Sequence, residues 1–285
     1  MSLKKIELRH NVELSSYTAL RIGGKAKYFF IVDNVDDLRL VLNDIGPEFY
    51  LLGAGSNLLV KDNLIKKPVI KLGEGFKFIE KRSGYFSIGS STKLSFLIKY
   101  CIENGLGGLQ QLTGIPAEIG GLLSMNASSF GKEISACLKS VAALDRKGNF
   151  KVLSKDEVSF GYRVSSLREL IVLSGDFIFN KEKNVKEQFG KFLKKKISSQ
   201  DFSFPSCGCV FKNPGDGFSA GALIDSCGFK GFVKGAAAVS EKHANFILNF
   251  GGANYQDVDY LINKIKETVY KSKGLLLEEE IIRWL

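Results

Sequence analysis

The spacing of apolar residues near the start of the chain predicts two strands joined by a helix. Residues Phe29–Val32 and Phe49–Leu52 are short apolar runs of the kind that form strands. Between them, Asn34 is a good N-terminal cap, and the apolar residues after it recur at helical spacing, at Val35, Leu38, Val41 and Leu42. This order favours an α/β or α+β lobe.

A second group of short strands and one helix follows. The helix begins after Ser91-Thr92, stops at Gly105, and has on one face Leu94, Leu97, Ile98 and Cys101. Two apolar runs flank the turn at 146–149 and predict a hairpin of Val141–Leu144 and Phe150–Leu153. Further strands are expected at Val69–Leu72, Phe76–Glu80, Tyr85–Ile88, Leu170–Leu173 and Phe177–Phe179.

The C-terminal part of the chain predicts a separate unit with two helices. A basic helix after Asn180 is expected to link it to the preceding strands. A short helix is expected at Ala220–Ser226, and a long one runs from Gln256 to Lys273 and ends at Gly274. One face of the long helix is expected to be buried, because it carries the stripe Val258, Leu261, Ile262, Ile265 and Val269. An extended run closes the chain over residues 275–285.

Composition narrows the class of protein. The chain has 285 residues, of which 45% are hydrophobic and 25% are charged, as in ordinary globular proteins. No apolar run reaches the roughly 18–20 residues that span a bilayer. No apolar segment follows the N-terminal lysines, so we expect no signal peptide. Five cysteines at irregular spacings argue against a disulfide framework, and we expect a cytoplasmic protein.

The net charge of +10 is concentrated in part in Lys181–Lys196. This segment can be a solvated amphipathic helix, or it can attract an anionic ligand. The positive charge is the only feature that supports nucleic-acid binding, since the sequence has no zinc-finger, helix-turn-helix or RNP-like motif. We expect small-molecule ligands and no nucleic-acid, membrane or obligate protein partner.

Two glycine-rich segments are candidates for a phosphate-binding site. The first, Gly53-Ala54-Gly55-Ser56-Asn57, lies between two apolar runs and lacks the helix of a dinucleotide fingerprint. Taken alone it can be an ordinary hairpin turn. The second, Thr113–Gly121, has three more glycines. Glycines let backbone N–H groups approach a phosphate closely, so the two together suit a ligand with a pyrophosphate and a long body.

Three further segments carry reactive side chains. Cys207-Gly208-Cys209 is predicted to lie in a tight turn between Pro205 and Pro214, and it can supply a thiol for proton transfer, a buried structural thiol or a metal ligand. Arg163 can be a surface cation, or its guanidinium can hold a carboxylate. The Glu278–Glu280 run can be a solvated edge, but an inward carboxylate in an anion-binding cleft would need a function.

Seven segments in a fixed order resemble the UDP-N-acetylenolpyruvoylglucosamine reductases, flavoenzymes of peptidoglycan precursor synthesis. They lie at 11–24, 52–57, 114–126, 145–163, 205–214, 239–245 and 277–281. Each motif is weak by itself, whereas seven in the same order are specific. The short stretch between Arg163 and Pro205 resembles the compact form of the family, which lacks an additional substrate-covering insertion.

The resemblance implies a three-lobed α+β fold of the vanillyl-alcohol-oxidase-like, PCMH-type, FAD-binding class. Residues 1–65 and 66–180 would form two FAD-binding lobes, with 275–285 returning to the active site. Residues 181–204 would be a linker helix and 205–274 the substrate-binding lobe. FAD is expected to be non-covalent, because His10 is the only histidine before residue 243 and lies outside both glycine-rich segments.

The resemblance also implies a reaction. NADPH, through FAD, would reduce the enolpyruvyl group of UDP-N-acetyl-3-O-(1-carboxyvinyl)-glucosamine to give UDP-N-acetylmuramate. By position, Arg163 would stabilise the developing enolate, Glu280 would donate a hydrogen bond to it if protonated, and Cys209 would supply the proton. Substrate contacts are expected at Tyr162, Lys212, Asn213, His243 and Asn245. Cofactor contacts are expected at Gly53, Ala54, Gly55, Ser56, Asn57, Thr113, Gly114, Ile115, Pro116, Gly120, Gly121 and Asn126, and no metal site is expected.

This sequence departs from the family pattern at three places. Cys209 replaces the usual serine, which predicts sensitivity to oxidation. Ala117-Glu118 replaces a glycine followed by serine or threonine, and we expect Glu118 to face away from the pyrophosphate. Ser128-Ser129 replaces a Gly-Ala pair. The alternatives are another oxidoreductase of the same flavin fold, acting on a sugar lactone or hydroxy acid, and a basic binding protein without enzymatic activity.

Overall fold

The computed structural model describes residues 6–215 and 217–285, and the chain divides into two compact units. Unit 1 comprises residues up to His10, Tyr28–Ala54 and Lys66–Lys196. Unit 2 comprises Asn11–Lys27, Gly55–Ile65 and Ile197–Leu285. Each unit therefore gathers segments that are distant in sequence. The lobe boundaries expected at residues 65, 180 and 204 stay a prediction.

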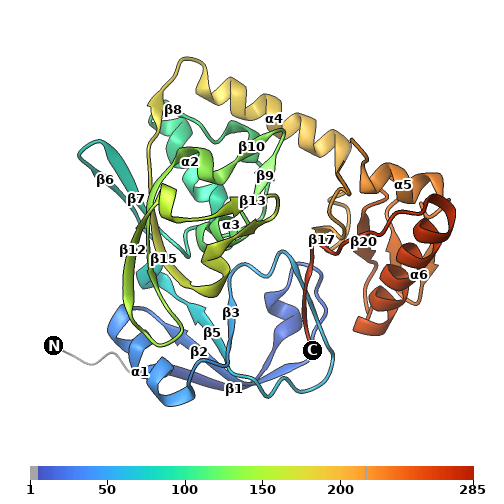
Figure 1. The fold of residues 1–285 in the computed structure, drawn as a ribbon, viewed down its shortest axis with the longest axis horizontal. Coiled ribbons are helices and arrows are strands. Elements are labelled where there is room, and N and C mark those ends of the chain that lie inside the picture. Colours follow the sequence, from blue (N-terminus) through green and yellow to red (C-terminus); the bar gives the residue numbers. More distant parts are fainter. Residues whose placement is uncertain (1–5, 216) are drawn as a thin grey trace. The chain divides into compact units, whose positions relative to one another are not determined.

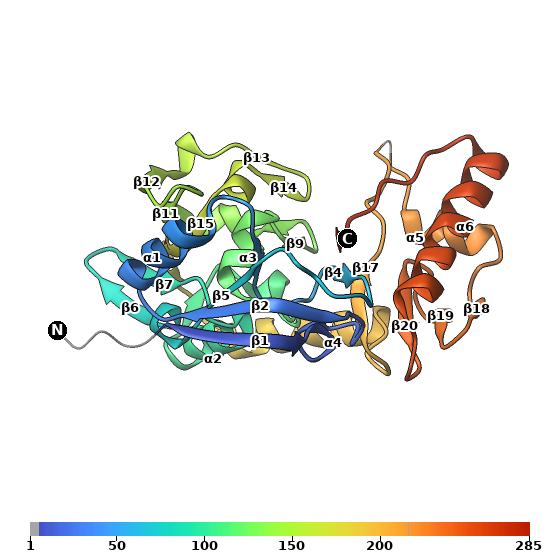
Figure 2. The ribbon, with the colours of Figure 1, turned by 90° about the horizontal axis from the view of Figure 1, so that it is seen from below.

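One sheet is built around the first strand–helix–strand unit. Its order is β1 (Glu7–Glu13), β2 (Lys25–Val32), β5 (Val69–Leu72) and β3 (Tyr50–Leu52), with β2 and β3 parallel to β5. Figure 2 shows β1 and β2 side by side. Helix α1 (Val35–Ile45) connects β2 to β3, and the Asn34 side chain accepts a hydrogen bond from the Asp37 N–H at 2.8 Å. The predicted helix, its cap and the burial of Leu38 are confirmed.

A five-stranded antiparallel sheet forms the second layer of unit 1. Its order is β12 (Phe150–Ser154), β11 (Leu138–Leu144), β15 (Ile171–Phe177), β7 (Tyr85–Gly89) and β6 (Ile79–Arg82). Helices α2 (Leu94–Glu103) and α3 (Ile119–Ser124) lie beside this sheet (Figure 1), and their buried residues belong to the same hydrophobic core. The hairpin of β11 and β12 is confirmed. Two expectations were wrong: the single strand β15 takes the place of the two strands expected at 170–173 and 177–179, and Glu74–Phe76 is a 3-10 turn.

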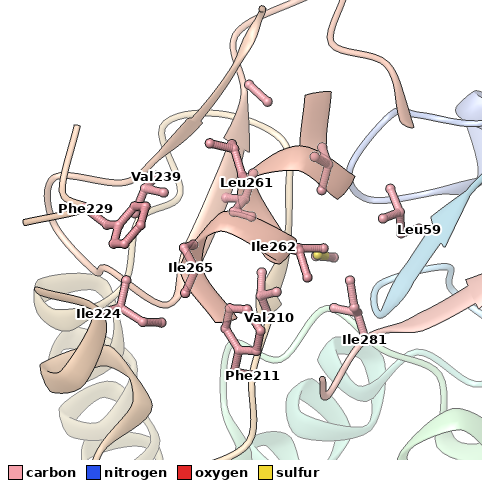
Figure 3. Packing of buried hydrophobic residues seen from close by; sticks show 14 of the residues in the cluster. Leu59, Val210, Phe211, Ile224, Phe229, Val239, Leu261, Ile262, Ile265 and Ile281 are labelled. Atoms are coloured by element: carbon pink, nitrogen blue, oxygen red, sulfur yellow. The ribbon is translucent and has the colours of Figure 1, made fainter. Parts of the chain in front are cut away.

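The core of unit 2 is formed by one long helix against a small antiparallel sheet. The sheet has the order β17 (Ser206–Cys209), β20 (Phe246–Asn249), β19 (Ala237–Val239) and β18 (Val233–Lys234). Helix α6 (Tyr255–Lys273) buries its predicted stripe, and Gly274 ends it in the left-handed conformation. Figure 3 shows Leu261, Ile262 and Ile265 of α6 packed around Val210 and Phe211. Helix α5 (Ala220–Ser226) adds Ile224 to the same core.

Short elements complete the two units. Helix α4 (Val185–Ser199) is the predicted basic helix, with Val185 and Phe189 buried. The two-stranded pairs are β8 (Leu106–Gly107) with β16 (Asn180–Lys181), β9 (Ser128–Ser129) with β10 (Lys132–Glu133), β13 (Phe160–Gly161) with β14 (Val164–Ser165), and β4 (Leu58–Val60) with β21 (Ile282–Trp284). Other 3-10 turns lie at Leu14–Tyr17, Gln110–Leu112, Ile134–Cys137, Lys155–Glu157 and Ser166–Glu169. Within the described ranges, no helix is both long enough and apolar enough to cross a membrane.

Candidate active site

Tyr162 and Arg163 form the tip of a tight hairpin in unit 1. The register pairs Phe160 with Ser165 and Gly161 with Val164, so these two residues alone connect β13 to β14. Arg163 has a φ of 58°, a left-handed conformation that is unfavourable for a residue with a side chain. The hairpin is held to the C-terminal end of α3, because the Ser165 hydroxyl donates to the carbonyls of Leu123 and Ser124.

The guanidinium of Arg163 is fixed by its surroundings in unit 1. Its Nη1 donates to the carbonyl oxygen of Ser128 at 3.0 Å and to the Ser128 hydroxyl at 2.7 Å. The guanidinium carbon lies 5.3 Å from the centre of the half-exposed Tyr162 ring. Arg168 Nη2 donates to the Arg163 carbonyl at 2.9 Å. A cation held in this way is preorganised to stabilise a carboxylate or enolate.

The second glycine-rich segment folds against the strand–helix connection before α2. The Ile115 N–H donates to the Leu112 carbonyl, and the Gly120 N–H donates to the Ser90 carbonyl at 2.9 Å. Pro116 has no N–H to offer. A ligand can therefore come close to Ile115, Pro116 and Gly120, but these residues have no backbone N–H to donate to it. Gly120 has a reason to be glycine, because a Cβ there would lie 3.1 Å from the Ser90 Cβ.

Lys71 joins the two glycine-rich segments within unit 1. Its Nζ donates to the Gly53 carbonyl at 3.1 Å and to Glu118 Oε1 at 3.2 Å. Burial raises the pKa of Glu118, and the positive charge of Lys71 only partly opposes this. Glu118 is 9% exposed, and its other carboxylate oxygen lies 3.6 Å from where a Gly53 Cβ would be. Glu118 therefore points towards the first glycine-rich segment, and its charge is paired with Lys71.

The remaining residues of the first glycine-rich segment, Gly55–Asn57, belong to unit 2. Gly55 has a φ of 64°, and a Cβ there would be 1.9 Å from the Tyr17 carbonyl oxygen, so only glycine is accommodated. The Asn57 side-chain amide donates to the Glu280 carbonyl at 3.0 Å, and the Asn57 carbonyl accepts from the Ile282 N–H at 2.9 Å. Asn57, expected to contact the cofactor, thus also holds the backbone of Glu280.

The cysteine segment pairs with the C-terminal glutamates in unit 2. The Glu280 N–H donates to the Val210 carbonyl at 2.8 Å, and the Lys212 N–H donates to the Glu278 carbonyl at 2.8 Å. This pairing brings Glu280 next to Cys209, which immediately precedes Val210. The sequence predicted a tight turn here, but Cys207 and Cys209 lie in the bulged strand β17. Burial and the nearby charges of Cys209 and Glu280 raise the pKa of Cys207 to about 12, which makes Cys207 a structural thiol.

The three glutamates have different environments. Glu278 forms an ion pair with Lys212, and Glu279 forms ion pairs with Lys266 at 3.2 Å and Arg283 at 2.7 Å. Glu280 is half-buried beside the cysteine segment. The catalytic role expected of Glu280 stays a prediction.

The other expected substrate residues of unit 2 make internal contacts. Asn245 is buried, and its amide bonds to both the N–H and the carbonyl of Phe211, at 2.9 and 2.8 Å. His243 Nδ1 accepts from the Asn245 N–H at 3.3 Å, and burial lowers the pKa of His243, which favours the neutral ring. Asn213 is exposed, and its side chain accepts from the first N–H of α5 at 3.0 Å. Asn245 and Asn213 thus shape the segment that carries Cys209 and Lys212.

The geometry of unit 1 fits FAD. Within residues 6–215 and 217–285, buried side-chain oxygens without a hydrogen-bond partner include Ser90 Oγ, Thr113 Oγ1 and Asn126 Oδ1. Thr113 adjoins the second glycine-rich segment, Ser90 lies against Gly120, and the Asn126 amide nitrogen donates to the Gly161 carbonyl at 3.2 Å. Buried polar atoms of this kind need a partner, and a large polar cofactor would supply one.

The expected site residues thus fall into two groups. Unit 1 brings together Gly53, Ala54, Thr113–Gly121, Asn126, Tyr162 and Arg163, and unit 2 brings together Gly55–Asn57, Lys212, Asn213, His243, Asn245, Cys209 and Glu280. Sequence reasoning missed Ser90, Lys71, Ser128 and Lys196. The polar run Ser90–Thr92 between a strand and a helix could have indicated the first. Lys196 belongs to the basic segment that could be either solvated or attractive to an anion; it is buried, and its Cδ lies 3.0 Å from where a Cβ on Gly114 would be.

Two protein-family models match the chain. Residues 26–154 match the model of the FAD binding domain, and residues 200–284 match that of the UDP-N-acetylenolpyruvoylglucosamine reductase C-terminal domain. Reductases of that name are 36% identical in Thermotoga petrophila, covering 95% of this chain and 97% of the relative, and 36% identical in Aquifex aeolicus, covering 95% and 93%.

A solved structure extends the likeness to the fold. The UDP-N-acetylenolpyruvylglucosamine reductase of Thermus caldophilus superposes with a TM-score of 0.85 at 32% identity, over 99% of both chains. The predicted α+β FAD-binding fold is confirmed. With relatives above 30% identity over nearly its whole length, the chain belongs to the UDP-N-acetylenolpyruvoylglucosamine reductase family.

Proposed function

We propose that this chain catalyses the FAD-dependent reduction of the enolpyruvyl group of UDP-N-acetylenolpyruvoylglucosamine to UDP-N-acetylmuramate, with NADPH as the reductant. Membership of the family supports the substrate and the cofactor. The observation that supports the assignment of residues is the pairing of 210–212 with 278–280, which holds the Glu280 backbone against Val210, the residue after Cys209. A generic flavin oxidase or a binding protein would not need this pairing.

The proposed roles follow from charge and proton balance. The two glycine-rich segments and Asn126 would hold FAD, whose chemistry is hydride transfer from NADPH to the terminal alkene carbon of the substrate. Negative charge then develops on the adjacent carbon and its carboxylate. Arg163, with its guanidinium fixed at Ser128, would stabilise that charge. Cys209 would donate its Sγ proton to the carbon and recover a proton from water, and Glu280 would hydrogen-bond to the enolate in its protonated form.

The remaining assignments concern binding. Tyr162, Lys212, Asn213 and His243 are proposed to line the substrate, and Asn245 to act through the Phe211 backbone that it holds. The ligands are all polyanions, which gives the net charge of +10 a function in attracting them. We place the reaction in the cytoplasm, because five cysteines at irregular spacings suit a reducing compartment.

An anaerobic absorbance experiment on the purified, FAD-loaded protein tests the proposal. Bleaching of the flavin bands by NADPH, followed by their recovery when the enolpyruvyl sugar nucleotide is added, is the expected result. Bleaching without recovery would remove the substrate assignment. Failure to oxidise NADPH, together with oxidation of an alcohol substrate, would favour an oxidase of the same fold. A protein that cannot be loaded with FAD would contradict the whole proposal.

A further inference from the structure

We infer that Ser128 is a positioning residue of the reductase, which holds Arg163 in the orientation that the reaction needs. The inference rests on the function proposed above for Arg163. Ser128 lies in β9, whereas Arg163 lies at the tip of the hairpin formed by β13 and β14, so the chain approaches the guanidinium from two separate elements.

The contact involves two atoms of Ser128. The Nη1 group of Arg163 donates to the Ser128 hydroxyl at 2.7 Å and to the Ser128 carbonyl at 3.0 Å. The shorter bond is within the range of charge-assisted hydrogen bonds, which are stronger than neutral ones. Any residue at position 128 supplies the carbonyl, but only a hydroxyl-bearing residue supplies the shorter bond. The side chain of Ser128 is therefore a specific determinant of the guanidinium orientation.

The backbone of Arg163 explains why such a restraint is needed. Its φ of 58° is unfavourable for arginine, and a long side chain on a two-residue connection has many rotamers. The Arg168 guanidinium fixes the Arg163 carbonyl, and the Asn126 amide fixes the Gly161 carbonyl. These bonds hold the backbone of the hairpin, whereas Tyr162 and Ser128 contact the Arg163 side chain itself. Preorganised orientation is what makes a cation effective against developing charge.

The test measures the two half-reactions separately in FAD-loaded variants. Ser128→Ala is expected to slow reoxidation by the enolpyruvyl sugar nucleotide about tenfold, the effect of losing a hydrogen bond to a charged group. Its rate of reduction by NADPH should be unchanged, and Ser128→Thr should restore reoxidation. Ser129→Ala, at the neighbouring serine of β9, is the matched control and should behave like the wild type.

A double-mutant cycle separates positioning from a general structural role. In an Arg163→Ala background, adding Ser128→Ala should cost nothing further, because the hydroxyl then has no guanidinium to hold. If Ser128→Ala slowed both backgrounds equally, or slowed neither, the inference would be wrong. If Arg163→Ala itself reoxidised at the wild-type rate, the role proposed for Arg163 would fail first, and that outcome is distinct from a failure at Ser128 alone.

Discussion

The side-chain amide of Asn57 donates to the backbone carbonyl of Glu280 over 3.0 Å, although the two residues are separated by most of the chain. The Glu280 N–H is bonded on its other side to the Val210 carbonyl. Glu280 is therefore fixed between the end of the first glycine-rich segment and the cysteine segment. This arrangement makes the C-terminal residues part of the site, and it is the reason that Cys209 is the first residue to test.

Cys209→Ala should separate the two half-reactions. We expect NADPH oxidation by the bound flavin to stay within about twofold of the wild type, whereas reoxidation by the substrate should slow about 100-fold or more, as when a general acid is removed. Cys209→Ser should keep most of the activity, since a hydroxyl can also supply the proton. Stopped-flow absorbance of each half-reaction measures both. Wild-type reoxidation in Cys209→Ala would mean that another group donates the proton.

Oxidation should inactivate the wild-type protein through Cys209. Cys207 is buried with its pKa raised to about 12, so it is a poor thiolate at neutral pH, whereas Cys209 is half-buried. Treatment with hydrogen peroxide should abolish substrate reduction in the wild type and spare Cys209→Ser. Cys227→Ser, which removes another half-buried thiol, is the control and should remain sensitive. Equal loss in Cys209→Ser and the wild type would point to damage elsewhere.

Arg163→Lys should be nearly as harmful as Arg163→Ala. A lysine keeps the charge but lacks the planar fork that contacts Ser128 on one side and can hold a carboxylate on another. We expect each variant to slow substrate reduction about 100-fold, with little change in the NADPH step. Steady-state and half-reaction kinetics check this. A lysine variant close to the wild type would show that a point charge is sufficient.

Lys71→Met should destabilise unit 1 by about 2–4 kcal/mol, because it leaves the Glu118 carboxylate buried without its cation. The folded pKa of Glu118 is already raised by burial, so the folded state favours its protonated form. Its contribution to stability is therefore full at acidic pH and is lost as the pH rises through the folded pKa. The penalty of Lys71→Met should accordingly shrink as the pH is lowered below neutrality.

Thermal denaturation with a fixed excess of FAD, followed from pH 7 down to about pH 4, near the unperturbed glutamate pKa, measures this dependence. Adding Glu118→Gln to Lys71→Met should recover most of the lost stability at pH 7, since no buried charge remains. A penalty that did not change with pH, or no recovery in the double variant, would show that Lys71 acts mainly through the Gly53 carbonyl.

Asn245→Ala should lower the stability of unit 2 by about 2–4 kcal/mol, because both backbone groups of buried Phe211 lose their partner. It should also slow substrate reduction, since Phe211 lies between Cys209 and Lys212. Leu261→Ala, in the middle of α6, is a control of similar thermodynamic cost. If both variants impaired substrate reduction equally at a temperature where they are folded, general destabilisation would explain the effect of Asn245.

The sequence determined the local elements of this protein and the identity of its candidate chemistry. Helices α1 and α6 follow from helical spacing, a capping asparagine and a terminating glycine, and α5 has a capping serine; all of these act within a few residues. The order of seven motifs was sufficient to indicate the family, because each motif records a local backbone or side-chain requirement. Arg163, Cys209 and Glu280 were nominated in the same way.

Only the tertiary structure decided how distant segments share contacts. Two contacts join residues that are far apart in the chain: the pairing of 210–212 with 278–280 and the Lys71–Glu118 ion pair. The spacing of residues along the sequence therefore could not predict them. The sequence predicted only that Glu118 faces away from a pyrophosphate; its burial beside Gly53 depends on a cationic partner, Lys71, supplied by another strand. Ser128 gained its importance for the same reason: its hydroxyl has a function only where the fold brings Arg163 to it.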